Sequence, residues 1–231
     1  MQPLKHIAPL AVFTDAGKWD LAGTAFALSA PDVVLTAAHC LHGFPAERVG
    51  YAHPRGGIIR ATSIDTHPSA DIAILRVPAD DARLTGFWGF VGNYGLGEEF
   101  MTYGFPYDDI GGGLKRLLPR MFIGHYQRFL GYTHGPWRYY AGEMSVPSPL
   151  GLSGAPIFRP GAEQMLTGIV TANMSSELVE DYYEETDRAG AKVVHKTARI
   201  TTYGIALMLH SIADWLKPRL PNLDVHPKAW E

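Results

Sequence analysis

Hydrophobic residues occur along this chain in short runs, each bounded by glycine, proline or another turn-forming residue. Valine, isoleucine, phenylalanine and tyrosine are frequent in these runs, which read LAVFT, AGTAFALS, DVVLTA, GGIIRATSID, DIAILRV, FMTYGF, RMFIGHY, APIF, LTGIVTA and RITTYGIAL. Short strands at regular spacing, separated by turn residues, are typical of all-β sandwiches and barrels. Strands do not alternate with helical segments, so the pattern indicates an all-β fold rather than a parallel α/β sheet.

Three segments do not follow this strand pattern. Residues 107–119, YDDIGGGLKRLLP, are rich in glycine and charge and predict a linker between an N-terminal domain, 1–108, and a C-terminal domain, 109–231. Residues 177–187, ELVEDYYEETD, are interpreted as an acidic surface loop. Near the C-terminus, the segment ALMLHSIADWLKP predicts an amphipathic helix that ends before Pro218. Its apolar face would comprise Leu207, Leu209, Ile212, Trp215 and Leu216.

Composition and charge narrow the possible partners. With 231 residues, 46% of them hydrophobic, the chain can form one large β domain or two small ones. The net charge is −3 and the charged residues are scattered, so no nucleic-acid partner is expected. No apolar run approaches the roughly 18 residues of a spanning helix, so no membrane association is expected. The N-terminal segment predicts a first strand rather than a signal peptide, because no cleavage site of small residues follows it.

Cys40 is the only cysteine, so the chain can form no internal disulfide. A reducing compartment suits such a chain, and we expect a bacterial cytoplasm. The thiol itself is interpreted as a small buried hydrophobe. The remaining histidines do not have the spacing of metal ligands, so we expect no metal and no other cofactor. These histidines include His42, His53, His125, His134 and His195.

Ser153 lies in the segment VPSPLGLSGAPIF, where glycines and prolines surround one hydroxyl. The strand-to-helix elbow of α/β-hydrolases also places glycines around a nucleophilic serine. That fold requires a helix directly after the serine, with the acid and the histidine further downstream. Here Pro156 and a strand-like run follow the serine, so the sequence context argues against the hydrolase elbow.

Three motifs instead resemble, in the same order, those of the chymotrypsin/trypsin-like serine proteases: VVLTAAHC, HPSADIAILRV and GLSGAPIF. They contain His39, Asp71 and Ser153, separated by 32 and 82 residues. The resemblance covers nearly the whole chain. It implies two six-stranded antiparallel β-barrels followed by a C-terminal α-helix, with His39 and Asp71 in the first barrel and Ser153 in the second.

The resemblance implies a serine endopeptidase that cleaves protein or peptide substrates through an acyl-enzyme intermediate. A serine hydroxyl is a weak nucleophile, so His39 would accept the proton of Ser153 and return it to the leaving amine. Asp71 would hold the imidazole in the correct tautomer and stabilise its cation. The backbone N–H groups of Gly151 and Ser153 would form the oxyanion hole.

The same resemblance places the substrate-binding residues in two groups. Pro147 and Ser148 would form the floor of the primary specificity pocket. The walls would be formed by Thr171, Ala172, Asn173 and Gly204. Because the floor carries no acid, we expect cleavage after a neutral residue of moderate size. The acidic segment 177–187 could still attract basic substrates, although a solvated surface loop is the simpler interpretation.

Leu152 occupies the position where extracellular family members carry an aspartate that pairs with a new N-terminus. A leucine cannot form that ion pair, so we expect an enzyme that is active as translated or is switched by a regulatory partner. The alternative is a catalytically inactive binding or scaffold protein on the same fold, which fold alone does not distinguish. The presence of all three triad residues favours the enzyme, with hydrolysis of small esters as a side activity.

Overall fold

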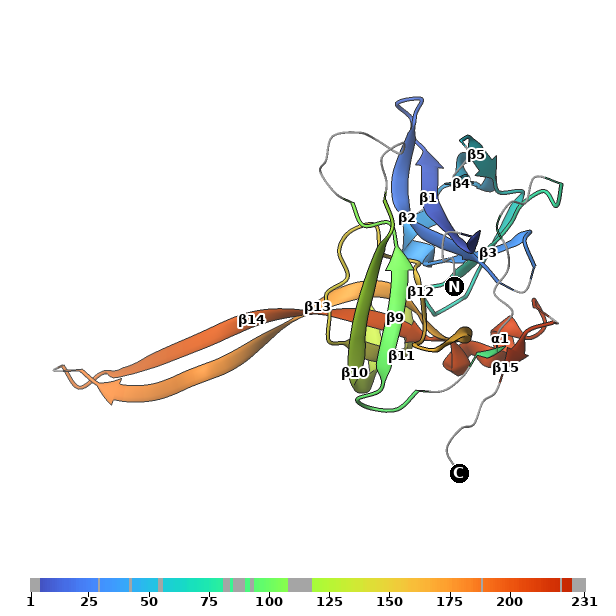
Figure 1. The fold of residues 1–231 in the computed structure, drawn as a ribbon. Helices are drawn as coiled ribbons and strands as arrows, with labels where there is room; N and C mark the ends of the chain where they lie inside the picture. The colour runs from blue at the N-terminus through green and yellow to red at the C-terminus, as the bar shows by residue number, and fades with distance from the viewer. Residues whose placement is uncertain are drawn as a thin grey trace.

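The structure is a computed structural model, and it describes residues 5–28, 30–41, 43–53, 56–80, 84, 90–91, 94–107, 118–187, 189–220 and 222–225. Two curled, predominantly antiparallel sheets make up the body of the protein (Figure 1). This arrangement confirms the predicted all-β class and resembles the trypsin-like double barrel. The predicted boundary between residues 108 and 109 lies at the edge of a segment outside the described residues.

The first sheet has seven strands in the order β5-β4-β1-β2-β3-β7-β6. Its strands are β1 (Ile7–Phe13), β2 (Trp19–Ala27), β3 (Val33–Thr36), β4 (Val49–Ala52), β5 (Ile58–Arg60), β6 (Ser63–Thr66) and β7 (Ala73–Arg76). All four residues of β3 are buried, because β2 and β7 flank it on both edges and side chains cover both of its faces. Such a strand appears in sequence as a continuous apolar run, as in VVLT.

The second sheet has eight strands in the order β12-β9-β10-β11-β14-β13-β8-β15, and β12 also pairs with β13, which closes the curl. Its strands are β8 (Phe90–Val91), β9 (Glu99–Gly104), β10 (Arg120–His134), β11 (Trp137–Met144), β12 (Pro156–Arg159), β13 (Ala162–Thr186), β14 (Lys192–Met208) and β15 (Asp224–Val225). The two predicted barrels are thus present, and among the described residues their sheets have seven and eight strands where six each were expected. The second sheet gains two very short strands, β8 and β15, which pair in parallel at its edge.

The prediction of an acidic loop at 177–187 was wrong. Strands β13 and β14 pair without interruption from Gly168 and Met208 to Thr186 and Lys192, apart from two bulges. Residues 176–201 form a two-stranded ribbon, here called the arm, which projects far from the body (Figure 1). Water reaches both faces of such a ribbon, so its strands need no apolar face. The alternation that identifies a strand in sequence is therefore weak there.

The predicted C-terminal helix is much shorter than expected. Strand β14 continues to Met208, a 3₁₀ helix, η5 (Leu209–Ile212), follows, and α1 (Ala213–Leu216) adds one turn. Residues 204–208 are all buried, so this end of β14 is apolar on both faces and cannot be told from a helix by periodicity. Within the described residues, no helix is long and apolar enough to cross a membrane.

One hydrophobic cluster joins the two sheets. It includes Phe26 and Leu35 from the first sheet, Phe158 and Leu207 from the second, and Leu216 from α1. All five side chains are fully buried. Because this cluster fixes the two sheets against each other, loops from both can hold a constant geometry where they meet.

Candidate active site

The side chain of Asp71 holds His39 through two hydrogen bonds, one to its backbone and one to its ring. His39 lies on the 3₁₀ turn η2 (Ala38–Leu41) that follows β3, and Asp71 lies just before β7. The His39 backbone N–H donates to Asp71 Oδ1 at 2.8 Å, and Nδ1 lies 2.7 Å from Oδ2. Asp71 is only 3% exposed. A buried carboxylate in this position fixes the ring orientation and leaves Nε2 for other chemistry.

The turn that presents Asp71 is shaped by His67. Its Nδ1 accepts hydrogen bonds from the N–H groups of Ser69, at 3.0 Å, and Ala70, at 2.8 Å. The second sheet also contributes, because the N–H of Arg138 donates to the Ser69 carbonyl at 2.6 Å. His67 therefore has a structural role in this turn.

The loop that carries Ser153 depends on two glycines. Gly151 and Gly154 have φ angles of +88° and +86°, in the left-handed region that favours glycine. A Cβ atom at Gly154 would lie 2.1 Å from the Thr24 carbonyl oxygen. Within the described part of the chain, the N–H groups of Gly151 and Ser153 donate no backbone or side-chain hydrogen bond. Two free donors on one tight turn are what an oxyanion hole requires.

Thr24, on β2, connects the first sheet to this loop. Its N–H donates to the Ser153 carbonyl at 2.8 Å, and its Oγ1 donates to the Gly151 carbonyl at 2.8 Å. The same Oγ1 accepts from the Phe105 N–H at 3.0 Å, and Thr36 Oγ1 donates to the Thr24 carbonyl at 2.8 Å. Both threonines are fully buried. Thr24 cannot be recognised from the sequence, because a threonine within a strand is common and its partners lie far away along the chain.

Cys40 contacts both His39 and the loop that carries Ser153. Its Sγ lies 3.6 Å from His39 Nε2 and 3.9 Å from the Ser153 carbonyl oxygen. His39 and Ser153, both described, share no hydrogen bond in this state. Catalytic hydrogen bonds are often absent before substrate binds. Gly23 makes room for the sulfur, since a Cβ there would lie 2.8 Å from it.

The pKa of His39 reflects these contacts. Burial lowers it, whereas the hydrogen bond to Asp71, the contact with Cys40 and the charges of both raise it, and the net effect is a pKa of about 10. At neutral pH the ring is therefore an imidazolium in this resting arrangement. It must lose a proton before it can serve as a general base.

Thr171 and Tyr139 form a buried pair behind the site. The Tyr139 hydroxyl donates to Thr171 Oγ1 at 2.9 Å, and Thr171 Oγ1 donates to the Ile205 carbonyl at 3.1 Å. Burial raises the pKa of Tyr139 above its usual value, and the nearby Asp71 charge raises it further, so the phenol stays protonated. Thr171 was predicted to line the pocket wall. Its hydroxyl is instead buried and hydrogen-bonded within the protein core.

Asn173 bridges the mouth of the predicted specificity pocket. Its Oδ1 accepts from the Ser148 N–H at 2.6 Å, and its Nδ2 donates to the Ser148 carbonyl. Gly204 lies opposite Asn173 in the register, and a Cβ there would lie 2.8 Å from the Val146 carbonyl oxygen. Pro147, a predicted floor residue, is exposed, whereas Ser148 is buried.

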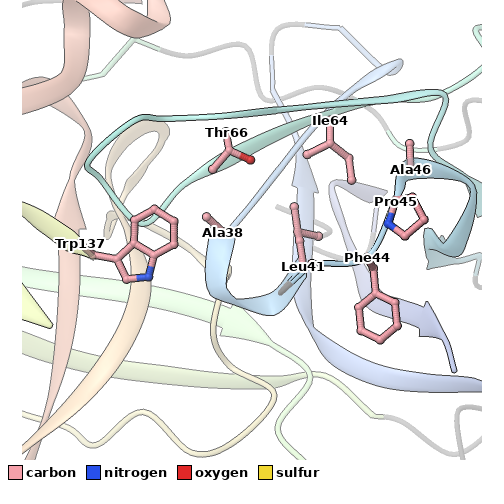
Figure 2. Close-up of a pocket in the computed structure, with 9 residues that line it drawn as sticks. Ala38, Leu41, Phe44, Pro45, Ala46, Ile64, Thr66 and Trp137 are labelled. Carbon is pink, nitrogen blue, oxygen red and sulfur yellow. The ribbon is translucent and has the colours of Figure 1, made fainter. Parts of the chain in front are cut away.

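A cavity of about 560 Å³ lies beside η2, next to the candidate site. It is lined by Ala38 and Leu41, by Thr66 on β6 and by Trp137 on β11 (Figure 2). Its volume lies within the range of small-ligand pockets. Among the described residues, no group of three or more histidine, cysteine, aspartate or glutamate side chains is arranged to hold a metal ion.

The family is established by sequence comparison. The family model of the trypsin-like peptidase domain matches residues 23–169, well over half of this chain. The chain therefore belongs to the trypsin-like peptidases. It is a serine-type endopeptidase, as the three motifs predicted. No curated protein matches the sequence closely.

Solved structures share the fold at low identity. The Rv3671c protease from M. tuberculosis in its active form is 19% identical, with a TM-score of 0.63 over 92% of this chain and 79% of that one. The MamO protease domain from Magnetospirillum magneticum, in its apo form, is 14% identical, with a TM-score of 0.61 over 94% and 96% of the two chains. The HtrA-type protease AlgW with a tripeptide is 17% identical, with a TM-score of 0.61 over 94% of this chain. This chain spans 60% of AlgW.

The role of Thr24 is tested by the near-isosteric substitution Thr24→Val. Loss of the hydroxyl leaves the buried Phe105 N–H without its acceptor and frees the Gly151 carbonyl. The free energy of unfolding should fall by about 1–3 kcal/mol, and the rate of reaction with a fluorophosphonate should fall up to about 100-fold. Thr62→Val, which removes an exposed hydroxyl in the turn between β5 and β6, is the control and should leave the rate unchanged. Equal rates for both variants would contradict the proposed role.

The pKa of His39 predicts an alkaline activity profile. Because the raised pKa favours the cation below about pH 10, the fluorophosphonate rate should keep increasing as the pH approaches 10. Cys40→Ala removes one contact that raises this pKa, so its profile should lie at lower pH than that of the wild type. Stopped-flow or quenched labelling from pH 5 upward measures both curves. A wild-type plateau already reached near neutral pH would refute the assignment.

Proposed function

We propose that His39, Asp71 and Ser153 form the catalytic triad of this endopeptidase. The observation that carries the proposal is the paired hydrogen bonding of His39 by buried Asp71, on the same side of the molecule as the serine loop that Thr24 anchors. Such a pair aligns the imidazole for proton transfer and stabilises its cation during attack.

In the proposed reaction, Ser153 Oγ attacks the substrate carbonyl while His39 Nε2 accepts the hydroxyl proton. The carbonyl oxygen becomes negative and is stabilised by the free N–H groups of Gly151 and Ser153. His39 then gives the proton to the leaving amine, which departs and leaves an acyl group on Ser153. A water molecule, deprotonated by His39, releases the acid. The first step requires Nε2 to exchange its contact with Cys40 Sγ for one with Ser153 Oγ.

The substrate would be a protein or peptide with a neutral residue of small to moderate size before the scissile bond. Support comes from the Asn173 bridge at the pocket mouth and from the absence of an acid at Pro147 and Ser148. The apolar cavity beside η2 would accept another apolar side chain of the substrate. No cofactor takes part in this mechanism.

Activation would not depend on a new N-terminus. Leu152 is fully buried and packs in a cluster with Phe100 and Ile157, so apolar contacts hold the position where an ion pair would form in extracellular relatives. The enzyme would be active as translated or switched by a regulatory partner protein. The single cysteine supports a bacterial cytoplasm as its compartment. An inactive binding or scaffold protein is the second candidate, but no feature of the described residues favours it.

The nucleophile is tested with a fluorophosphonate probe. Wild-type protein should be labelled covalently and Ser153→Ala should not, because the probe reacts only with an activated hydroxyl. Hydrolysis of a sensitive peptide should fall by about 10⁶-fold in the variant. Ser145→Ala, directly after the end of β11, should retain labelling. If neither the wild type nor Ser153→Ala is labelled, the scaffold interpretation is correct.

The pocket bridge is tested with Asn173→Gly. Removal of the amide should open the pocket, so a peptide-library profile should shift toward larger residues before the scissile bond. Ser175→Gly, two residues further along β13 and exposed, is the matched control and should keep the wild-type profile. A wild-type preference for arginine or lysine, or an unchanged profile in Asn173→Gly, would contradict the proposed pocket.

A further inference from the structure

The arm is a direct continuation of the strand that lines the proposed cleft. Strand β13 passes Asn173, beside the pocket, and continues without a break to Thr186 at the tip of the ribbon (Figure 1). From Ala172 to Thr186 the strand spans about 45 Å at roughly 3.3 Å per residue. The cleft and the outer part of the arm therefore share a single backbone.

From Ala172 onward, one edge of β13 has no strand partner among the described residues. Strand β14 covers the opposite edge of β13 along the whole arm, whereas β12 pairs with β13 only as far as Ile169. Between Ala172 and Thr186, no other described strand pairs with the β13 backbone. A long free edge offers N–H and C=O groups to an added strand, and proteins usually shorten or cover such edges.

The charge of β13 favours a basic partner. Between residues 177 and 187 the sequence has six acidic residues and no basic one. Glu177 and Glu184 form ion pairs with lysines of β14, and Glu185 is hydrogen-bonded to His195. Neither Glu180 nor Asp181, at the bulge, forms an ion pair with another described residue. These acids also oppose edge-to-edge pairing of two β13 strands, because like charges would face each other.

The arm also exposes apolar side chains that nothing covers. The register places Val179, Tyr182, Val194 and Ile200 on one face. Their exposed fractions are 53%, 56%, 53% and 74%. A two-stranded ribbon is marginally stable by itself. A third strand along β13 would extend the sheet, and its side chains could pack beside Val179 and Tyr182.

We propose that the arm binds the substrate segment upstream of the scissile bond. This segment would be an extended polypeptide, rich in basic residues interspersed with apolar ones, that adds to the free edge of β13. The inference rests on the proposed function, since it continues the proposed cleft outward. Residues about ten or more positions before the cleavage site would thereby contribute to substrate choice.

Binding can be measured without catalysis on Ser153→Ala. The probes are a fluorescein-labelled peptide of about 16 residues rich in lysine, valine and threonine, its acidic counterpart with glutamate for lysine, and a basic tetrapeptide. Fluorescence anisotropy should show that the long basic peptide binds at least about tenfold more tightly than the other two. The affinity should fall with added salt.

The arm is tested by deletion and by charge. Replacing residues 177–200 with Asn-Gly joins Ser176 to Thr201, which are paired across the ribbon, by a two-residue hairpin turn. It should abolish the advantage of the long peptide without lowering the melting temperature, because the hydrophobic clusters contain no residue of this segment. Glu180→Lys should weaken binding several-fold, whereas Glu99→Lys, an exposed control of equal charge change, should not.

Three results would overturn the inference. These are equal affinity for long and short peptides, equal affinity for the acidic peptide, or unchanged binding after deletion. If deletion converts a dimer to a monomer in light scattering while peptide binding is unchanged, the arm joins two copies of the chain instead. Fluorophosphonate labelling of the wild type reports the proposed function separately. Tight peptide binding with no labelling would support the arm site and refute only the catalysis.

Discussion

The hydrogen bonds of Thr24 to the serine loop are the constraint on which the site depends. The proposed nucleophile and oxyanion donors lie in the loop between β11 and β12 of the second sheet, whereas His39 and Asp71 lie at the ends of strands β3 and β7 of the first. Thr24 links the carbonyls of Gly151 and Ser153 to β2 with one backbone and one side-chain donor. With both carbonyls held, the peptide group between Leu152 and Ser153 has little freedom, so the Ser153 N–H, one of the two proposed oxyanion donors, keeps a fixed orientation.

The contact between Asp71 and His39 has two opposing consequences. The carboxylate orients the ring and would stabilise the cation formed during the proposed attack, but in the resting state it also raises the pKa of the imidazole, so Nε2 keeps the proton that a general base must lose. Cys40 adds to this effect, because its sulfur contacts the nitrogen that Ser153 must reach. Substrate binding that brings Ser153 Oγ to Nε2 and displaces this contact would lower the pKa and activate the base.

Sequence predicted the residues whose role depends on local backbone form and did not predict those defined by contacts between distant segments. The serine loop requires glycine at two positions, and His39 directly follows a buried apolar strand. Each of these features can be recognised within a short stretch of sequence. Thr24 bonds to a residue 127 positions away, and Asn173 to one 25 positions away, so neither leaves one. The acidic strand resembles a loop in sequence. Water reaches both faces of the ribbon, so its residues do not alternate between hydrophobic and polar. The buried end of β14 was taken for a helix because it is apolar on both faces.

Because β13 is continuous, contacts along the arm and contacts near Asn173 should affect KM and kcat differently. A segment bound along the arm makes the same contacts before and during attack on the carbonyl, so its binding energy lowers KM rather than raising kcat. That energy can raise kcat only if strand pairing also fixes the scissile bond against Ser153, which requires an unbroken ladder from the arm to Asn173. The bulge at Glu180 interrupts the register between β13 and β14 within the arm. Contacts beyond this bulge would therefore act mainly on affinity, and those between Asn173 and the bulge on both affinity and rate.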